Sequence, residues 1–444
     1  MTPGIAVGIF GIIIVIGFIG EILFQYTKIP SILFLMAAGI LLGPVYGIFN
    51  QNVFLGFAPY LSTLVLVLIM FQGGLELNFL TVFKSSYLSM LLILIGLALS
   101  IFLVGGIFYL MGGGGLIQSL MLGTVVSCSS STVIIPLLPN IDATEKNKTI
   151  IAIESTFNDA FAIIVLIILI NIAKNASVHV GIGGVALQTV YSFGVSALIA
   201  VVSGIAWYAL LKFLVKTKFA YSVTFAAMLV IILIMHYVHG NGAIAILVFG
   251  IMMGNEELLT KLKVNFFNMS IKNSIIKQFN HEFSFLIRTV FFVFLGVVVE
   301  LHKDNWVFFD RLFIIIVLII LARYAAVSSI FKLENFKFKK NAKEMQENAS
   351  VQESRKDQKK EKFFMFSMIG RALATAIMAY MPLNAGISGT SKFPEYAFMV
   401  IIITNVLLTA GVWYGSHGFK PEPVCGDNNI NAEGGGGVNA GGNY

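Results

Sequence analysis

Residues 154–159 read Glu-Ser-Thr-Phe-Asn-Asp, and they lie within an apolar stretch that runs from 149 to 173. About 20 apolar residues suffice for a helix to span a membrane. Two carboxylates and an amide are costly at that depth, and such groups usually face a water-filled cavity or a partner along an ion or proton path. The stretch therefore predicts a membrane-spanning fold with an ion-handling site inside it.

The composition of the whole chain indicates a membrane protein. Of its 444 residues, 57% are hydrophobic and 11% are charged, with a mean hydropathy of +0.89, whereas soluble domains carry about 25% charged residues. Two cysteines, Cys128 and Cys425, make no disulfide framework. The apolar start has neither a basic leader nor a small-residue cleavage site, so we expect it to be a first span and not a removed signal.

Thirteen apolar segments are candidates for membrane spans, and we expect an all-α polytopic protein. They cover residues 3–25, 30–49, 57–78, 86–111, 115–139, 149–173, 185–211, 219–238, 240–255, 281–301, 307–331, 362–382 and 394–415. Residues 1–332 and 362–415 should form one transmembrane domain. Residues 333–361 are expected to be a charged cytoplasmic insertion, and residues 416–444 a disordered tail.

Positive charges are divided unevenly between the loops, which orients the chain. If the thirteen segments cross in turn, 22 Lys and Arg residues fall on one side, four on the other and three inside spans. Cytoplasmic loops carry the excess of basic residues. We therefore expect a multi-pass cell-membrane protein with its N-terminus outside and its C-terminus in the cytoplasm. This topology explains the net charge of +7 without a nucleic-acid partner.

Two short motifs occur twice in the chain. The matching pairs are residues 39–43 with 250–254, and residues 71–76 with 294–300. The paired spans are seven segments apart, an odd number, so the second copy would be upside down. We predict inverted repeats, 1–173 and 219–415, joined by a linking helix at 185–211. Inverted repeats are typical of secondary transporters, which bind their substrates near the midplane on interrupted helices.

The two segments that pair as fifth and twelfth are unusually polar. The fifth contains Ser127-Cys-Ser-Ser-Ser-Thr132, and the twelfth contains Ser367-Met-Ile-Gly-Arg371. Serine hydroxyls compete with the hydrogen bonds of the helix backbone, and unwound backbone within a membrane is tolerated only where it lines a cavity or is buried in protein. We therefore predict two broken helices that cross near the midplane.

Asp159 is the candidate carrier of an ion and a proton. A carboxylate at this depth can hold a proton or, once deprotonated, a hard cation. Competition between the two for one carboxylate is sufficient for antiport. Asp159 and Ser155, four residues apart on one helix face, are the candidate Na⁺ ligands, and no other metal or cofactor is expected. The further candidate binding residues are Asn158, Ser129, Ser130 and Glu76.

Glu154 calls for a different role, because an unpaired charge at this depth would be neutralised. Apart from Lys362 at the very start of the twelfth segment, Arg371 is the only basic residue on the predicted pair of broken helices, and a buried arginine needs a carboxylate because it does not deprotonate. We predict a structural Glu154–Arg371 ion pair that stabilises the crossing.

These motifs together resemble the monovalent cation:proton antiporter family, most of all its archaeal NhaP-type sodium/proton antiporters and animal sodium/proton exchangers. The stretches that carry the resemblance are Pro30–Pro44, Phe71–Leu77, Glu154–Asp159, Phe291–Gly296 and Gly370–Thr375. The likeness covers nearly all of residues 1–415.

The resemblance implies a thirteen-helix homodimer whose mobile core moves by an elevator motion. It makes Asp159 the essential carboxylate, Ser155 a ligand and Glu154–Arg371 the structural pair. The Asn158-Asp159 sequence implies electroneutral exchange of one Na⁺ or Li⁺ for one proton. One position departs from the family, whose broken fifth helix usually reads Thr-Asp-Pro, since the aspartate is replaced here by Ser130.

Three alternatives to sodium/proton antiport remain open. Serine-threonine runs at this position are similar to the potassium-linked branch, so a potassium/proton antiporter is the first. The missing aspartate also leaves room for a channel or sensor on the same fold. An intramembrane serine protease using Ser129–Ser131 with His236 or His239 is disfavoured, because no Gly-x-Ser-x-Gly elbow is present.

Overall fold

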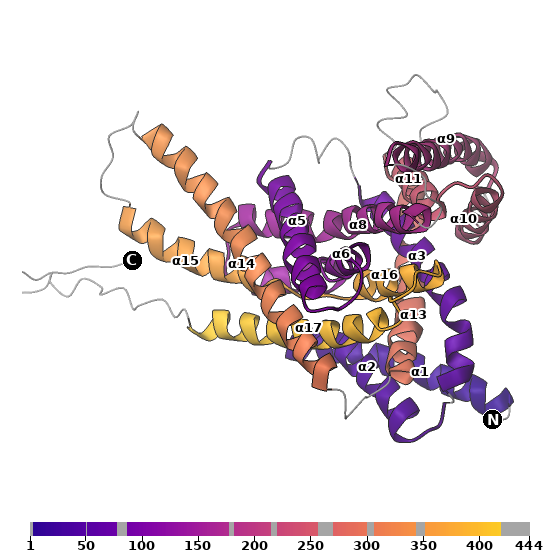
Figure 1. Cartoon of the computed structure of the whole chain (residues 1–444), viewed down its shortest axis with the longest axis horizontal. Helices are drawn as coiled ribbons and strands as arrows, with labels where there is room; N and C mark the ends of the chain where they lie inside the picture. Colours follow the sequence, from indigo (N-terminus) through magenta and orange to yellow (C-terminus); the bar gives the residue numbers. More distant parts are fainter. Residues whose placement is uncertain are drawn as a thin grey trace, which may run out of the picture.

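The computed structural model describes residues 3–49, 51–77, 87–176, 182–214, 220–255, 270–299, 306–342 and 351–418. All regular elements in these residues are helices, and most of them pack side by side in one bundle (Figure 1). The α-helices of the first half are α1 (Pro3–Thr27), α2 (Ser31–Ile40), α3 (Gln51–Glu76), α5 (Tyr87–Leu110), α6 (Leu116–Val125), α7 (Ser131–Ile134), α8 (Glu145–Ala176) and α9 (Ile182–Leu214). Those of the second half are α10 (Ala220–Tyr237), α11 (Gly242–Gly254), α13 (Ser270–Val298), α14 (Trp306–Ala342), α15 (Val351–Ser367), α16 (Leu373–Asn384) and α17 (Phe393–Gly418). Short helices of other types cover Leu41–Val45 and Ile135–Asn140.

Nine of the described helices are long and apolar enough to cross a membrane. The other four expected spans, at 30–49, 115–139, 240–255 and 362–382, correspond to shorter or interrupted helices. The all-helical polytopic fold is therefore confirmed, while the count of thirteen crossings stays a prediction. The end of the chain from residue 419 lies outside the described residues.

The helix breaks predicted in the fifth and twelfth segments are present, and they contact each other. Helix α6 ends at Val125, and residues 128–130 are not helical; α15 ends at Ser367, and residues 368–372 are not helical. The Ser130 backbone N–H donates to the Gly370 carbonyl oxygen at 2.9 Å. Each break thus satisfies part of the freed backbone of the other, as buried polar groups require.

The repeated glycine motifs form two close helix crossings, one of α2 and the short helix that follows it (Leu41–Val45) with α13, and one of α3 with α11. A Cβ atom added at Gly43 would lie 2.7 Å from Val297 Cα, and one added at Gly254 would lie 2.5 Å from the Leu75 carbonyl oxygen. Only glycine permits backbones to approach this closely. In both crossings a motif from one half of the chain packs on the other half, and the inverted orientation of the repeats stays a prediction.

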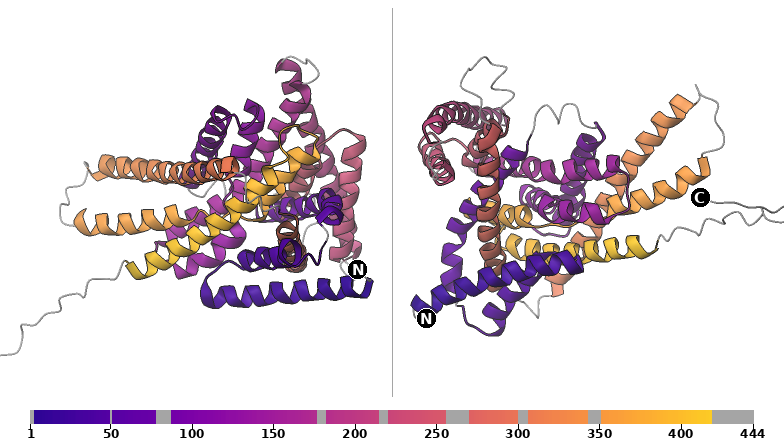
Figure 2. Two further views of the ribbon diagram at one scale, coloured as in Figure 1. Left: turned by 60° about the horizontal axis from the view of Figure 1, so that its bottom comes forward. Right: turned by 180° about the vertical axis from the view of Figure 1, so that it is seen from behind.

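Helices α14 and α15 extend into the charged insertion from either side, and its centre, 343–350, lies outside the described residues. Together, α14 and α15 extend well beyond the rest of the bundle (Figure 2). The C-terminal half of α15 contacts the N-terminal end of α8 and the residues just before it. Lys360 pairs with Asp142. Glu361 accepts hydrogen bonds from the Thr144 backbone N–H at 3.2 Å and from Asn147 Nδ2 at 2.5 Å. The Glu361 carboxylate thus satisfies one backbone N–H and one side-chain amide at the positive end of α8, where a negative charge is stabilised.

Candidate ion-binding site

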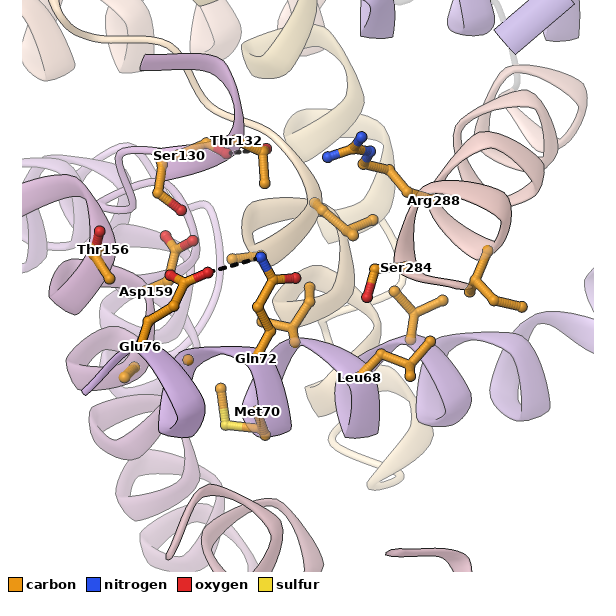
Figure 3. Close-up of a pocket in the computed structure, with 18 residues that line it drawn as sticks. Leu68, Met70, Gln72, Glu76, Ser130, Thr132, Thr156, Asp159, Ser284 and Arg288 are labelled. Atoms are coloured by element: carbon orange, nitrogen blue, oxygen red, sulfur yellow. Dashed lines mark hydrogen bonds between the residues drawn. The ribbon is translucent and has the colours of Figure 1, made fainter. Parts of the chain in front are cut away.

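A cavity of about 50 Å³ lies in the middle of the bundle, next to the broken segment 126–130. Helices α3, α8, α13 and α16 and the start of α7 contribute side chains to it (Figure 3). We call it the ion cavity. The polar residues that line it include Glu76, Ser130, Thr132, Thr156, Asp159 and Arg288.

Two carboxylates face the ion cavity from different helices. Asp159 comes from the middle of α8, and its Oδ1 atom is buried and accepts no hydrogen bond in the described residues. Glu76 lies at the last residue of α3, where its Oε1 accepts a hydrogen bond from Gln72 Nε2 at 3.0 Å (Figure 3). Asp159, Glu76 and Ser130 were all predicted as site residues, and the fold brings them to one cavity.

Hydroxyl groups complete the oxygen-rich side of the ion cavity. Ser130 Oγ lies 2.9 Å from Thr132 Oγ1. Thr156 also lines the cavity, and its hydroxyl donates to the Ala152 carbonyl at 2.8 Å, which leaves its oxygen lone pairs available. Neither Thr132 nor Thr156 was among the residues predicted for the site. The spacing of Thr156, three residues before Asp159 on the same helix, is the signal that would have indicated it.

Three other predicted binding residues, Ser155, Ser129 and Asn158, do not line the ion cavity. Ser155 is fully buried, and its hydroxyl donates to the Ala152 carbonyl of its own helix at 3.1 Å. Ser129 Oγ donates to Glu154 Oε1 at 2.7 Å. Asn158 Nδ2 donates to Ser129 Oγ at 3.2 Å and to the Ser127 carbonyl at 3.1 Å. Ser129 and Asn158 therefore belong to a network on the Glu154 side of α8.

The ion pair of Glu154 is formed with Arg323, and the expected pairing with Arg371 is wrong. Arg323 Nη1 lies 3.0 Å from Glu154 Oε1, and the two residues are only 9% and 2% exposed. Arg323 also donates twice to the Met365 carbonyl. Arg323 is on α14, inside a long apolar helix, where a guanidinium needs a carboxylate as much as the carboxylate needs a cation.

Arg371 instead binds the broken backbone. Its Nε donates to the Val126 carbonyl at 2.8 Å, and its Nη1 donates to the Ile369 carbonyl. Val126 is the C-cap residue directly after α6, so the guanidinium lies at the negative end of that helix. Asn405 Nδ2 donates a hydrogen bond to the Arg371 carbonyl oxygen at 2.6 Å. Arg371 thereby joins the two broken segments through backbone carbonyls and not through Glu154.

Comparison with known proteins identifies the chain. The family described as "Sodium/hydrogen exchanger, transmembrane" matches residues 11–415. The chain belongs to the sodium/hydrogen exchanger family. The resemblance read from the motifs of the sequence is thereby confirmed, and the interrupted helices and the ion cavity described above are features of an exchanger-family member.

Solved structures of an archaeal protein share this exchanger fold. The sodium proton antiporter MjNhaP1 from Methanocaldococcus jannaschii at pH 8 is similar with a TM-score of 0.67 and 17% identity, over 94% of this chain and 97% of that one. An electron-microscopy structure of MjNhaP1 gives a TM-score of 0.63 and 15% identity, over 95% of this chain and all of that one. At such identities the likeness concerns the fold.

Proposed function

We propose that this protein is a sodium/proton antiporter in which Asp159 carries a cation and a proton in turn. The observation that carries the proposal is the buried Asp159 Oδ1 atom, which accepts no hydrogen bond within the described part of the chain, beside a cavity that is also lined by Glu76 and five hydroxyl-bearing side chains. Family membership and the name of MjNhaP1 as a sodium proton antiporter support it.

The cavity offers the ligands that a small hard cation prefers. Asp159, Glu76, Ser130, Thr132 and Thr156 supply only oxygen atoms, and hard cations bind oxygen. A proton on Asp159 removes the charge that attracts the cation, so the two compete. As the pH falls, protons displace the cation, and the apparent KM for Na⁺ rises. One Na⁺ exchanged for one proton moves no net charge, which is the electroneutral exchange proposed here.

Alternating access would come from movement of the segments around the ion cavity. The cavity lies between α8 and α16, which adjoin the broken segments, and α3 and α13, which form the glycine crossings. We propose that the first group moves against the second as an elevator, in a homodimer, with the N-terminus outside and the C-terminus in the cytoplasm. The partners are then monovalent cations, protons and the lipid bilayer.

Potassium is the second candidate cation, favoured by one observation. Ser130 and Thr132 present neutral hydroxyls to the cavity, and Ser130 occupies the position where the family usually has an aspartate. Fewer charged ligands weaken the advantage of a small cation with a high charge density, such as Na⁺, over a larger one.

The test is dequenching of a pH-sensitive dye in proteoliposomes on addition of Na⁺, Li⁺ or K⁺. Asp159→Asn should abolish the response while the protein still elutes as a folded species. Glu145→Gln is the matched control, because Glu145 is an 88%-exposed carboxylate at the start of the same helix, and it should leave exchange unchanged. Full activity in Asp159→Asn would refute the role of Asp159. A response to K⁺ alone would assign potassium as the substrate, and no response from folded wild type would indicate a channel or sensor.

A further inference from the structure

A second cavity, larger than the ion cavity, lies toward the C-terminal end of α8. Its volume is about 640 Å³, and it is bounded by α3, α8, α9 and α16 and by the turn between α10 and α11. We call it the distal cavity. The polar and ionisable side chains in its lining include Asn171, Lys174, Gln188, Tyr191, His239 and Asn384.

The two cavities have opposite charge. The ion cavity contains the carboxylates of Glu76 and Asp159 and one cation, Arg288. Among the residues that the structure describes, the lining of the distal cavity contains no carboxylate, and its ionisable groups are the Lys174 ammonium, the His239 imidazole and the Tyr191 phenol. Lys174 and His239 are exposed. A cleft with charges of one sign and low-dielectric walls sets the local concentration of ions. The distal cavity therefore disfavours cations.

Apolar side chains separate the two cavities. Along α8, Ile163 and Leu166 are fully buried between Asp159 and Lys174. These two charged residues are fifteen positions apart, or about 22 Å along the helix axis at about 1.5 Å per residue. A cation that leaves Asp159 toward this end of the molecule crosses the apolar layer and then meets the Lys174 charge.

We propose that Lys174 makes the exchanger kinetically asymmetric, by raising the apparent KM for cations at the face onto which the distal cavity opens. This inference rests on the proposed antiport and extends it. Repulsion by Lys174 speeds departure of a released cation and slows its rebinding, while it leaves the ion cavity and its KM at the opposite face unchanged. The charge bias of the loops makes the distal face the outer one, so the asymmetry favours export of the cation over its return.

The first test measures transport at each face. Right-side-out and everted membrane vesicles from the same cells expose opposite faces, and the KM for the driving cation is measured in both. Lys174→Gln should lower the KM at the distal face by roughly two- to tenfold, and Lys174→Glu should lower it further, with kcat and the KM at the other face unchanged. High ionic strength should shrink the effect because it screens exposed charges.

Lys392→Gln is the matched control. Lys392 is an exposed lysine on the same predicted side of the membrane, and it lies outside the lining of the distal cavity. It should leave both KM values unchanged. An unchanged KM in Lys174→Glu, or an equal effect of Lys392→Gln, overturns the proposal. A shift at the opposite face places the distal cavity inside and overturns the proposed direction.

A second test measures the electrostatic potential in the distal cavity and does not depend on transport. In a chain with Cys425→Ser, Gln188→Cys places a thiol in the lining of the distal cavity, while Cys128 is buried. The ratio of its reaction rates with an anionic and a cationic methanethiosulfonate reagent should fall by roughly twofold or more in Lys174→Gln and stay constant in Lys392→Gln. A constant ratio in both refutes the inference even if antiport is real, whereas a falling ratio in a protein without exchange refutes only the proposed function.

Discussion

The Glu154–Arg323 ion pair makes a quantitative prediction, because both residues are buried and Glu154 Oε1 accepts from Arg323 at 3.0 Å. Removal of one partner from a buried pair leaves the other charge uncompensated and costs about 3–5 kcal/mol. We expect Arg323→Met to reach this range, since it also removes two hydrogen bonds to the Met365 carbonyl. Glu154→Gln should cost less, because an amide still accepts from Ser129 and Arg323.

The expected shift in melting temperature follows from the length of the chain. The entropy of unfolding is about 2.1 cal/mol/K per residue, so 444 residues give about 0.9 kcal/mol/K. A loss of 3–5 kcal/mol then lowers the apparent melting temperature by about 3–5 °C. Tryptophan fluorescence of the purified protein in detergent at a fixed heating rate measures this shift.

A double-mutant cycle separates Arg323 from Arg371 as the partner of Glu154. The double variant Glu154→Gln/Arg323→Met removes both charges, so it should be more stable than the sum of the single changes predicts, by at least about 1 kcal/mol. The cycle with Arg371→Met should be close to additive, because Arg371 binds backbone carbonyls. Strong coupling to Arg371 with none to Arg323 would refute the assignment.

Further variants test other parts of the structure. Gly250→Ala should cost about 1–3 kcal/mol, because its Cβ would lie 2.6 Å from the Phe71 carbonyl oxygen, whereas Gly73→Ala, with nothing within 4 Å, should not lower the melting temperature. Glu361→Gln should lower the free energy of unfolding by about 1 kcal/mol or less, because it weakens the cap on α8; the same thermal unfolding experiment measures this. A loss as large as that of Arg323→Met would contradict a capping role. Ser130→Asp should lower the KM for Na⁺ at alkaline pH by about tenfold, because it adds a third carboxylate to the ion cavity, and an unchanged KM would show that position 130 does not contact the ion.

The sequence was sufficient to predict the helical membrane fold, the two helix breaks and three residues of the ion cavity. These features follow from local patterns: the length of the apolar segments, the serine runs, and polar groups whose burial in a membrane-spanning helix is costly. In the structure α8 has two polar faces, since Glu154 and Asn158 both bind Ser129 while Asp159 faces the ion cavity.

Long-range partners were beyond the sequence. Arg323 was counted as a basic residue inside a span, but nothing in its neighbourhood indicates that α14 lies beside Glu154. Arg371 was predicted as the partner because it lies on the paired broken segment. Its hydrogen bond to the Val126 carbonyl depends on where α6 ends, which the sequence does not show. Ser155 was misassigned as a cavity residue for a local reason: a serine within a helix can bond its own backbone, as it does here with Ala152.

The glycine crossings have a consequence for measurements of motion. In α2–α13 and α3–α11, backbone atoms meet backbone atoms, so no side chain can change rotamer to let one helix slide past the other. Each pair must keep its geometry or separate. A spin label on α3 and another on α11 should therefore report one constant distance whatever ion is present. That distance is an internal reference against which a displacement of α8 can be measured.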